Sequence, residues 1–265
     1  MRTGLPFWIG FHVAVFLLLA LDLFVFRRKE RAISMKEAAF CSVIWVALSL
    51  AFGACIYATM GAAKGVEFFT GYVIEYSLSM DNLLVFMMIF ACFKVPPRSQ
   101  HRVLLWGILG ALAMRGAMIG LGVELVRRFE WILYGFGVFL LVTGLRMFVR
   151  KGESVSDENF VIRGCRKIPR VTPEFHGSAF LVRTAAGWML TPLAVALVVV
   201  DVMDLAFAVD SIPAIFAVTR DPFIVYTSNI CAILGLRSLY FLVAGVAARF
   251  RRLHYGLAAV LTFIG

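Results

Sequence analysis

Two copies of one short acidic motif provide the residues whose types and spacing are best suited to chemistry. Residues 75–86 read EYSLSMDNLLVF and residues 204–216 read DLAFAVDSIPAIF, 129 positions apart. The copies align three pairs of oxygen-bearing side chains: Glu75 with Asp204, Asp81 with Asp210, and Asn82 with Ser211. Each copy lies in an apolar segment, where even one carboxylate is costly, so we expect these groups to serve a function.

Carboxylate, amide and hydroxyl oxygens suit hard divalent cations such as Mn²⁺, Mg²⁺ and Ca²⁺. The five cysteines are scattered, so the sequence offers no Cys–His cluster that would favour copper or zinc. Asp201 lies one turn from Asp204. We expect equally that it binds the metal directly or that it contacts residues that do. The predicted metal-binding residues are Glu75, Asp81, Asn82, Asp201, Asp204, Asp210 and Ser211.

The two carboxylates within each copy are six residues apart, which on a continuous helix separates them by about 120°. Either the binding cavity wraps around a third of the helix, or the helix unwinds locally and frees backbone carbonyls as further ligands. Pro213 in the second copy favours such a distortion.

Arg115 and Arg237 also lie in apolar segments and are predicted to balance or gate the acidic residues, although joining helices is a comparable role. Five carboxylates against these two arginines leave a formal charge of −3, which one divalent cation reduces to −1. Repulsion and desolvation both disfavour charged carboxylates, so the metal-free site should take up protons, and competition between metal and protons would support antiport. The alternative is a purely structural ion-pair network. Asp22 is predicted to be an interfacial cap or vestibule residue rather than a ligand.

The composition places the chain in a lipid bilayer. Of its 265 residues, 62% are hydrophobic and 16% are charged, and the mean hydropathy is +0.90. Apolar runs long enough to cross about 30 Å of hydrocarbon predict an all-α polytopic helix bundle. We expect eight spans, at residues 5–26, 38–60, 66–92, 104–126, 131–149, 187–218, 223–247 and 253–265. The last is shorter than the roughly 20 residues that a crossing needs, which indicates a truncated sequence.

The duplication extends beyond the acidic motif, because Arg115 in GALAMRG aligns with Arg237 in AILGLRS. Each unit therefore contains three spans, at 66–149 and 187–265, and an odd number of crossings makes the second unit enter from the opposite side. Such inverted-topology repeats are typical of secondary transporters that bind substrate near the midplane. The single transmembrane domain, 1–265, then comprises an N-terminal helix pair at 5–60, the two units, and a polar linker at 150–183.

The net charge of +10 indicates membrane orientation rather than nucleic-acid binding. Of the 26 Lys and Arg residues, five lie on one predicted side and 19 lie on the other, in loops 27–37, 93–103, 146–183 and 248–252. Because the side richer in Lys and Arg is cytoplasmic, we predict a multi-pass protein of the bacterial inner (plasma) membrane, with the N-terminus outside and the 150–183 loop inside.

The chain resembles the TerC family of integral membrane proteins in four segments: EYSLSMDN, FKVPPRSQHRVLLWGILGALAMRG, AVDSIPAIFAVTRDPFIVYTSNI and AILGLRSLYF. This family is named for tellurium resistance, includes the Alx-type proteins and is associated with Mn²⁺ export. The resemblance implies a manganese exporter whose metal path contains Glu75, Asp81, Asn82, Asp204, Asp210 and Ser211. One departure is Asp201, where relatives commonly have Glu, and the shorter side chain weakens the case for direct ligation.

We therefore expect an exporter of divalent cations, with Mn²⁺ as the transported ion, protons as the candidate coupling ion, no organic cofactor and no enzymatic activity. The alternative is a membrane metal sensor, or a tellurium-resistance or membrane-protein assembly factor, that uses the same acidic residues. An intramembrane aspartyl protease fits less well, because its two carboxylates must share a proton in a water-filled cleft.

The predicted orientation can be tested by cysteine accessibility. A cysteine placed in the 150–183 loop should react with a membrane-impermeant thiol reagent only after the cells are permeabilised, because the charge asymmetry places this loop inside. A cysteine in the 64–67 loop serves as the control and should react in intact cells. Labelling of the 150–183 position in intact cells would contradict both the topology and the inverted repeat.

Overall fold

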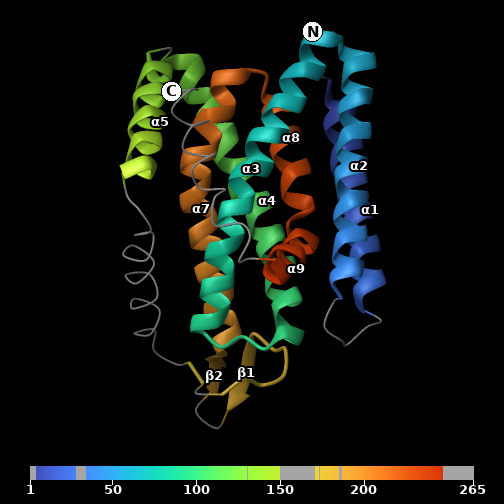
Figure 1. Cartoon of the computed structure of the whole chain (residues 1–265), viewed down its shortest axis with the longest axis vertical. Coiled ribbons are helices and arrows are strands. Elements are labelled where there is room, and N and C mark those ends of the chain that lie inside the picture. Colours follow the sequence, from blue (N-terminus) through green and yellow to red (C-terminus); the bar gives the residue numbers. More distant parts are fainter. Residues whose placement is uncertain are drawn as a thin grey trace.

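The described residues fold into a bundle of helices with a short β-hairpin (Figure 1). The computed structural model describes residues 4–27, 34–129, 131–149, 171–172, 174–184 and 187–246. Its elements are α1 (Leu5–Arg27), α2 (Met35–Met60), α3 (Ala62–Cys92), α4 (Pro97–Arg128), α5 (Ile132–Val149), β1 (Leu181–Thr184), β2 (Gly187–Leu190), α7 (Pro192–Val218), α8 (Pro222–Leu234) and α9 (Leu236–Val246). The predicted polytopic helical fold is thereby confirmed.

The apolar helices agree with most of the predicted spans. Among the described residues, α1, α2, α3, α4 and α7 are each long and apolar enough to cross a membrane. A sixth span results if α8 and α9 are taken together, with a bend of 45° between them. α5 is apolar but shorter over its hydrophobic part, and the predicted span 253–265 lies outside the described residues.

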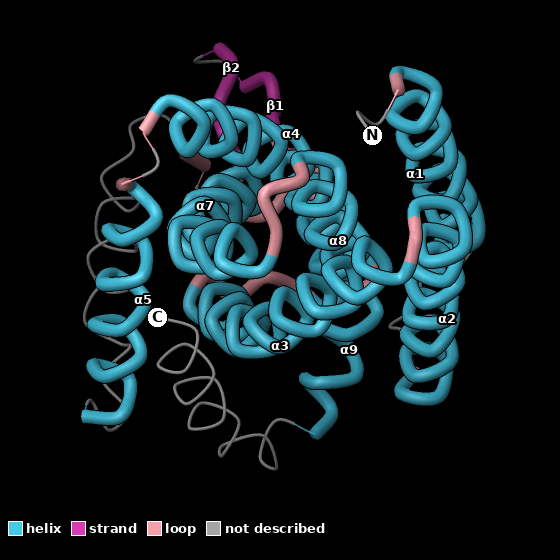
Figure 2. Tube along the Cα trace, turned by 90° about the horizontal axis from the view of Figure 1, so that it is seen from above, coloured by secondary structure: helices cyan, strands magenta, loops and turns pink. Residues whose placement is uncertain are grey.

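Four helices form the centre of the bundle. α3 packs against α7 and α8, and α4 packs against the same two helices. Seen from above, α1 and α2 lie on one side of this group and α5 lies on the opposite side, next to α7 (Figure 2). Side chains from the four central helices can therefore meet away from lipid.

α3 and α7 run in opposite directions. The hydroxyl of Thr219, just after α7, donates a hydrogen bond to Glu67 near the start of α3, and Lys64 lies 3.3 Å from Asp221. The hairpin that precedes α7 lies at the other end of the molecule (Figure 1). An inverted repeat requires this antiparallel course, but residues 253–265, its predicted sixth helix, are not described, so the repeat stays a prediction.

Glycines on α4 bring it close to α7, as expected for glycines that permit helix packing. A Cβ atom at Gly122 would lie 2.7 Å from the ring of Phe216, and one at Gly110 would lie 3.0 Å from both carboxylate oxygens of Asp201. Larger residues at these two positions would push α4 away from α7.

The helices that carry the acidic motifs are continuous, which excludes the local unwinding considered from the sequence. α7 runs from Pro192 to Val218 without a break, with Pro213 inside it. The bend occurs instead at Gly235, between α8 and α9, so the predicted span 223–247 is two helices. A Cβ atom at Gly235 would lie 3.3 Å from the Cβ of Trp45 on α2, and glycine allows this contact.

The sequence predicts a polar linker up to residue 183 and a membrane span from residue 187. The structure instead has a β-hairpin at residues 181–190. β1 and β2 pair antiparallel, with Leu181 opposite Leu190. Helix α7 begins five residues later than predicted because Thr191 caps it, its hydroxyl accepting a hydrogen bond from the backbone of Ala194, and Pro192 fits the first helical position.

Candidate functional site

A buried arginine joins the two acidic motifs. Arg115 of α4 donates from Nε and Nη2 to the two carboxylate oxygens of Asp204 on α7, at 3.0 and 2.9 Å, and from Nη1 to Glu75 on α3. Nη1 also lies 3.3 Å from Oδ1 of Asn229 on α8 and 3.5 Å from Oγ of Ser211. The exposed fractions of Arg115, Glu75 and Asp204 are 0%, 0% and 4%, so the group is shielded from solvent and lipid.

The guanidinium geometry explains why arginine stands at this place. Its planar fork binds the Asp204 carboxylate through two parallel hydrogen bonds and still has a donor for Glu75. The three charged groups carry a formal charge of −1. Within the described part of the chain, Oε2 of Glu75 and Nδ2 of Asn229 have no hydrogen-bond partner. One carboxylate oxygen is therefore left to accept a further ligand.

The second acid of each motif lies at a different depth from this centre. Asp81 follows Glu75 by six residues and Asp210 follows Asp204 by six, a rise of about 9 Å along each helix. Because α3 and α7 are antiparallel, Asp81 lies toward the hairpin end and Asp210 toward the opposite end. The doubled motif thus places carboxylates on both sides of Arg115.

Asp201 lies one turn from Asp204, on the hairpin side of the centre. Its carboxylate packs against α4 beside Gly107 and Gly110, and its Oδ1 has no hydrogen-bond partner among the described residues. Asn82 is buried on α3, next to Asp81. Both residues extend the polar surface toward the hairpin.

The structure brings together only some of the predicted site residues. Glu75, Asp204 and Ser211 surround Arg115, whereas Asp81 and Asp210 are separated from that centre along the helix axes. Among the described residues, no three His, Cys, Asp or Glu side chains form a group that could hold a metal ion. The seven predicted ligands therefore form no single site in this conformation, because the six-residue spacing is kept by continuous helices.

Arg237 has a different partner from Arg115. Its Nη2 lies 2.7 Å from Oδ2 of Asp22 on α1, and both side chains are largely buried. Asp22, which was predicted to be an interfacial cap or vestibule residue rather than a ligand, therefore pairs with an arginine of the C-terminal half of the chain, a contact that was not predicted. Arg237 and Asp204 line the same small pocket, of about 20 Å³, so the second arginine lies near the first centre without joining it.

Asn229 was not predicted from the sequence. It lies in the polar run Thr227, Ser228 and Asn229 of an otherwise apolar segment, and all three are fully buried. This polar run was the signal from which Asn229 could have been predicted. It has no counterpart in the first acidic motif, so comparing the two copies of the motif could not reveal it.

The comparisons with known proteins identify the family. Residues 60–265 match the integral membrane protein TerC family. The chain belongs to the TerC family. An uncharacterized membrane protein of Myxococcus xanthus, STKORF319, is 49% identical over 259 residues, which cover 97% of this chain and 81% of the relative.

Two further TerC relatives, from Salmonella typhi and Escherichia coli K12, are provisionally named membrane-bound redox modulator Alx. Each is 48% identical over 274 aligned positions, which cover 99% of this chain and 85% of the relative. No solved structure matches the chain significantly. The resemblance to the TerC family found in the sequence is confirmed.

Replacing the central arginine should strongly destabilise the protein. Arg115→Met leaves two carboxylates buried without their partner, and we expect a loss of about 3–5 kcal/mol in the free energy of unfolding. The matched control is Arg128→Met, which breaks an ion pair with Glu124 whose side chains are 70% and 54% exposed, and should cost about 1 kcal/mol or less. The measurement is denaturant unfolding of the purified protein in detergent.

A compensated variant separates charge from packing in the same experiment. Combining Arg115→Met with Glu75→Gln and Asp204→Asn removes all three charges and should recover most of the lost stability. Equal stability of Arg115→Met and Arg128→Met would show that the buried ion pairs do not hold the four helices together.

Proposed function

We propose that this TerC protein exports divalent metal cations, with Mn²⁺ as its main substrate, through the space enclosed by α3, α4, α7 and α8. The observation that carries the proposal is the arrangement of carboxylates at several depths around the buried Arg115. Buried acids within membrane-spanning helices are costly and typically mark ion pathways. Their carboxylate, amide and hydroxyl oxygens suit a hard cation.

In this mechanism Arg115 occupies the centre when no metal is bound. Its guanidinium takes the place of a cation between Glu75 and Asp204, which keeps the two carboxylates neutralised and closes the path. An arriving cation first binds the oxygen of Glu75 that has no hydrogen-bond partner among the described residues, and then competes with Arg115 for the remaining oxygens. Asp81 and Asp210 provide carboxylates on the two sides of the centre, where the ion enters and leaves.

Protons are the proposed coupling ion. Asp22 balances Arg237, so the five acids of the pathway are opposed by Arg115 alone and keep a formal charge of −4. A divalent cation neutralises half of this charge. Such a set of carboxylates binds protons when the metal leaves, because repulsion and desolvation both disfavour the charged forms. Metal and protons then exchange at the same oxygens.

The proposed setting is the bacterial inner membrane, with the N-terminus outside. This orientation rests on the distribution of Lys and Arg over the whole sequence, which is richer on the side of the 150–183 loop. Transport from that loop toward the N-terminal end of the bundle is then export.

The name of the Alx relatives suggests redox chemistry as another function. Among the described residues no two of Cys41, Cys55, Cys92 and Cys231 form a disulfide, and Cys55 and Cys92 are exposed on different helices. This part of the chain offers no dithiol pair, whereas its buried carboxylates are numerous. Metal transport is therefore the function that the described residues support better.

Neutralising the outer acids should abolish transport without unfolding the protein. Asp81→Asn and Asp210→Asn each remove one of the carboxylates that flank the centre, and we expect Mn²⁺ flux to fall at least about tenfold, a loss of roughly 1.4 kcal/mol or more. Membrane insertion should stay intact, since a charge within the membrane-spanning helix is removed. The measurement is metal uptake by inside-out vesicles, with Mn²⁺, Mg²⁺, Ca²⁺ and tellurite compared.

Glu174→Gln is the matched control for this assay, because Glu174 lies outside the predicted spans and away from the acidic motifs. It should transport as the unmodified protein does. Full Mn²⁺ flux in both aspartate variants would refute the pathway, and Mn²⁺ binding without flux in the unmodified protein would favour a metal sensor.

Proton exchange makes a separate prediction about pH. The apparent affinity for Mn²⁺ should weaken as pH falls from 8 to 5, because protons occupy the same oxygens, and metal binding should release protons. Calorimetric titration of the purified protein with Mn²⁺ in two buffers of different ionisation enthalpy measures that release. An enthalpy independent of the buffer, with an affinity flat over this range, would exclude proton coupling.

A further inference from the structure

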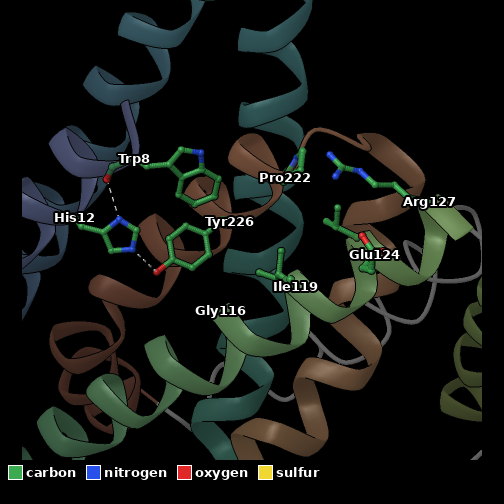
Figure 3. A pocket seen from close by; sticks show the side chains of 10 residues that line it. Trp8, His12, Gly116, Ile119, Glu124, Arg127, Pro222 and Tyr226 are labelled. Carbon is green, nitrogen blue, oxygen red and sulfur yellow. Dashed lines mark hydrogen bonds between the residues drawn. The ribbon is translucent and has the colours of Figure 1, made fainter. Parts of the chain in front are cut away.

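A pocket of about 470 Å³ opens at the end of the bundle where the N-terminus lies. It is formed by three helices: Trp8 and His12 of α1, Pro222 and Tyr226 of α8, and one face of α4 (Figure 3). The α4 residues that line it are Gly116, Ile119, Gly120, Val123, Glu124 and Arg127. None of these residues belongs to the acidic motifs.

The pocket reaches the level of the buried centre. Its lining on α4 extends from Arg127, near the helix end, to Gly116, which follows Arg115 directly. From Gly116 to Arg127 there are eleven helical rises, which correspond to about 16 Å along the helix axis. That length is roughly half of the 30 Å hydrocarbon thickness of a bilayer.

Tyr226 lies at the inner end of this pocket. Its ring would be 3.4 Å from a Cβ atom at Gly116, and it stands one helical turn from Asn229, which contacts Arg115. The side chain is fixed from the α1 side, since its hydroxyl lies 3.1 Å from Nε2 of His12 and its ring stacks on that imidazole. Tyr226 therefore lines the pocket at the level of Gly116, the residue next to Arg115.

The hydrogen bonds define the roles of the two side chains. Nδ1 of His12 lies 2.8 Å from the backbone carbonyl of Trp8, which can only accept, so Nδ1 carries a proton. In the neutral imidazole Nε2 then accepts the hydrogen bond that the Tyr226 hydroxyl donates. The Tyr226 ring also packs against Trp8 and Phe11 of α1, so α1 holds the tyrosine through this hydrogen bond and through ring contacts.

We propose that this pocket is an aqueous vestibule through which the hydrated cation passes between the Arg115 centre and the N-terminal side, and that Tyr226 closes its inner end. The passage of metal rests on the proposed function, whereas the water-filled vestibule does not. The volume has room for on the order of fifteen water molecules, at about 30 Å³ each. Polar groups lie at both ends: His12 and Tyr226 inside, and Glu124 and Arg127 at the mouth.

Cysteine labelling at Gly120 of α4 tests directly whether the pocket holds water. No described atom lies within 4 Å of a Cβ atom built at Gly120, so Gly120→Cys places a thiol in the pocket without displacing a neighbour. Gly10→Cys on α1 and Gly135→Cys on α5 are matched controls, since both have the same free space, are exposed and do not line the pocket. The five native cysteines are first replaced by serine or alanine.

The reagent is a charged, membrane-impermeant methanethiosulfonate applied to the protein in lipid vesicles. Because the thiolate that reacts forms only where water is present, Gly120→Cys should be modified at least about tenfold faster than either control. Equal rates at Gly120 and the controls would show a dry or lipid-filled groove and overturn the vestibule. Mn²⁺ flux should also be lost once Gly120→Cys is modified, since the adduct blocks the passage.

A second pair of variants tests the role of Tyr226. A Cβ atom at Gly116 would lie 3.4 Å from the Tyr226 ring at the inner end of the pocket, so Gly116→Cys should react more slowly than Gly120→Cys. Adding Tyr226→Ala should raise its rate toward that of Gly120→Cys. A rate at Gly116 that does not change with Tyr226→Ala would show that this residue does not close the vestibule.

Failure of this proposal is distinguishable from failure of the proposed function. Fast labelling at Gly120 in a protein that moves no Mn²⁺ would leave the vestibule standing and overturn metal export. Full Mn²⁺ flux with no labelling at Gly120 would leave metal export standing and overturn the vestibule.

Discussion

The charge-paired Arg115 is the constraint on which the rest of this structure depends. A guanidinium with no exposed surface must be met by carboxylates, because an unpaired charge in the low-dielectric interior costs several kcal/mol. Glu75 comes from α3 and Asp204 from α7, so the arginine on α4 fixes three helices at once. α8 joins them through Asn229. The four central helices therefore pack around a polar contact, although their remaining surfaces are apolar.

The antiparallel direction of α3 and α7 decides where the two motifs place their second acids. If α3 and α7 ran in parallel, the two motifs would place Asp81 and Asp210 at the same depth. Their antiparallel course instead spreads the carboxylates to both sides of Arg115 while the first acid of each motif stays at the centre. The six-residue spacing then sets a step of about 9 Å, which suits transfer between neighbouring sites better than binding of one ion by all of the acids.

The sequence was sufficient to predict a structural feature where burying a charged residue is costly or where a pattern repeats. Acids and an arginine in apolar segments predicted a polar centre, and the lengths of the apolar runs predicted the helices. Arg237 and Asp22 show the limit, because their pairing joins a helix outside the repeat to one within it, and no pattern in the chain relates the two positions. The bend at Gly235 depends on its contact with Trp45, a tertiary feature that local propensity does not contain.

Arg115 and Arg237 align in the sequence but have different surroundings. This asymmetry is a property of the conformation that the structure shows. Arg115 lies beside a pocket of about 470 Å³ that is open at the N-terminal end, whereas the pocket that Arg237 lines holds only about 20 Å³. A carrier that alternates between two sides of a membrane must be asymmetric in any single state, since a path open at both ends would dissipate the gradient. Under the proposed mechanism, Arg115 holds the acids of both motifs while the N-terminal side is hydrated down to Tyr226 and the side of Arg237 is packed. The pairing of Arg237 with Asp22 then keeps the second guanidinium away from Asp204, so that of the two aligned arginines Arg115 alone pairs with Asp204.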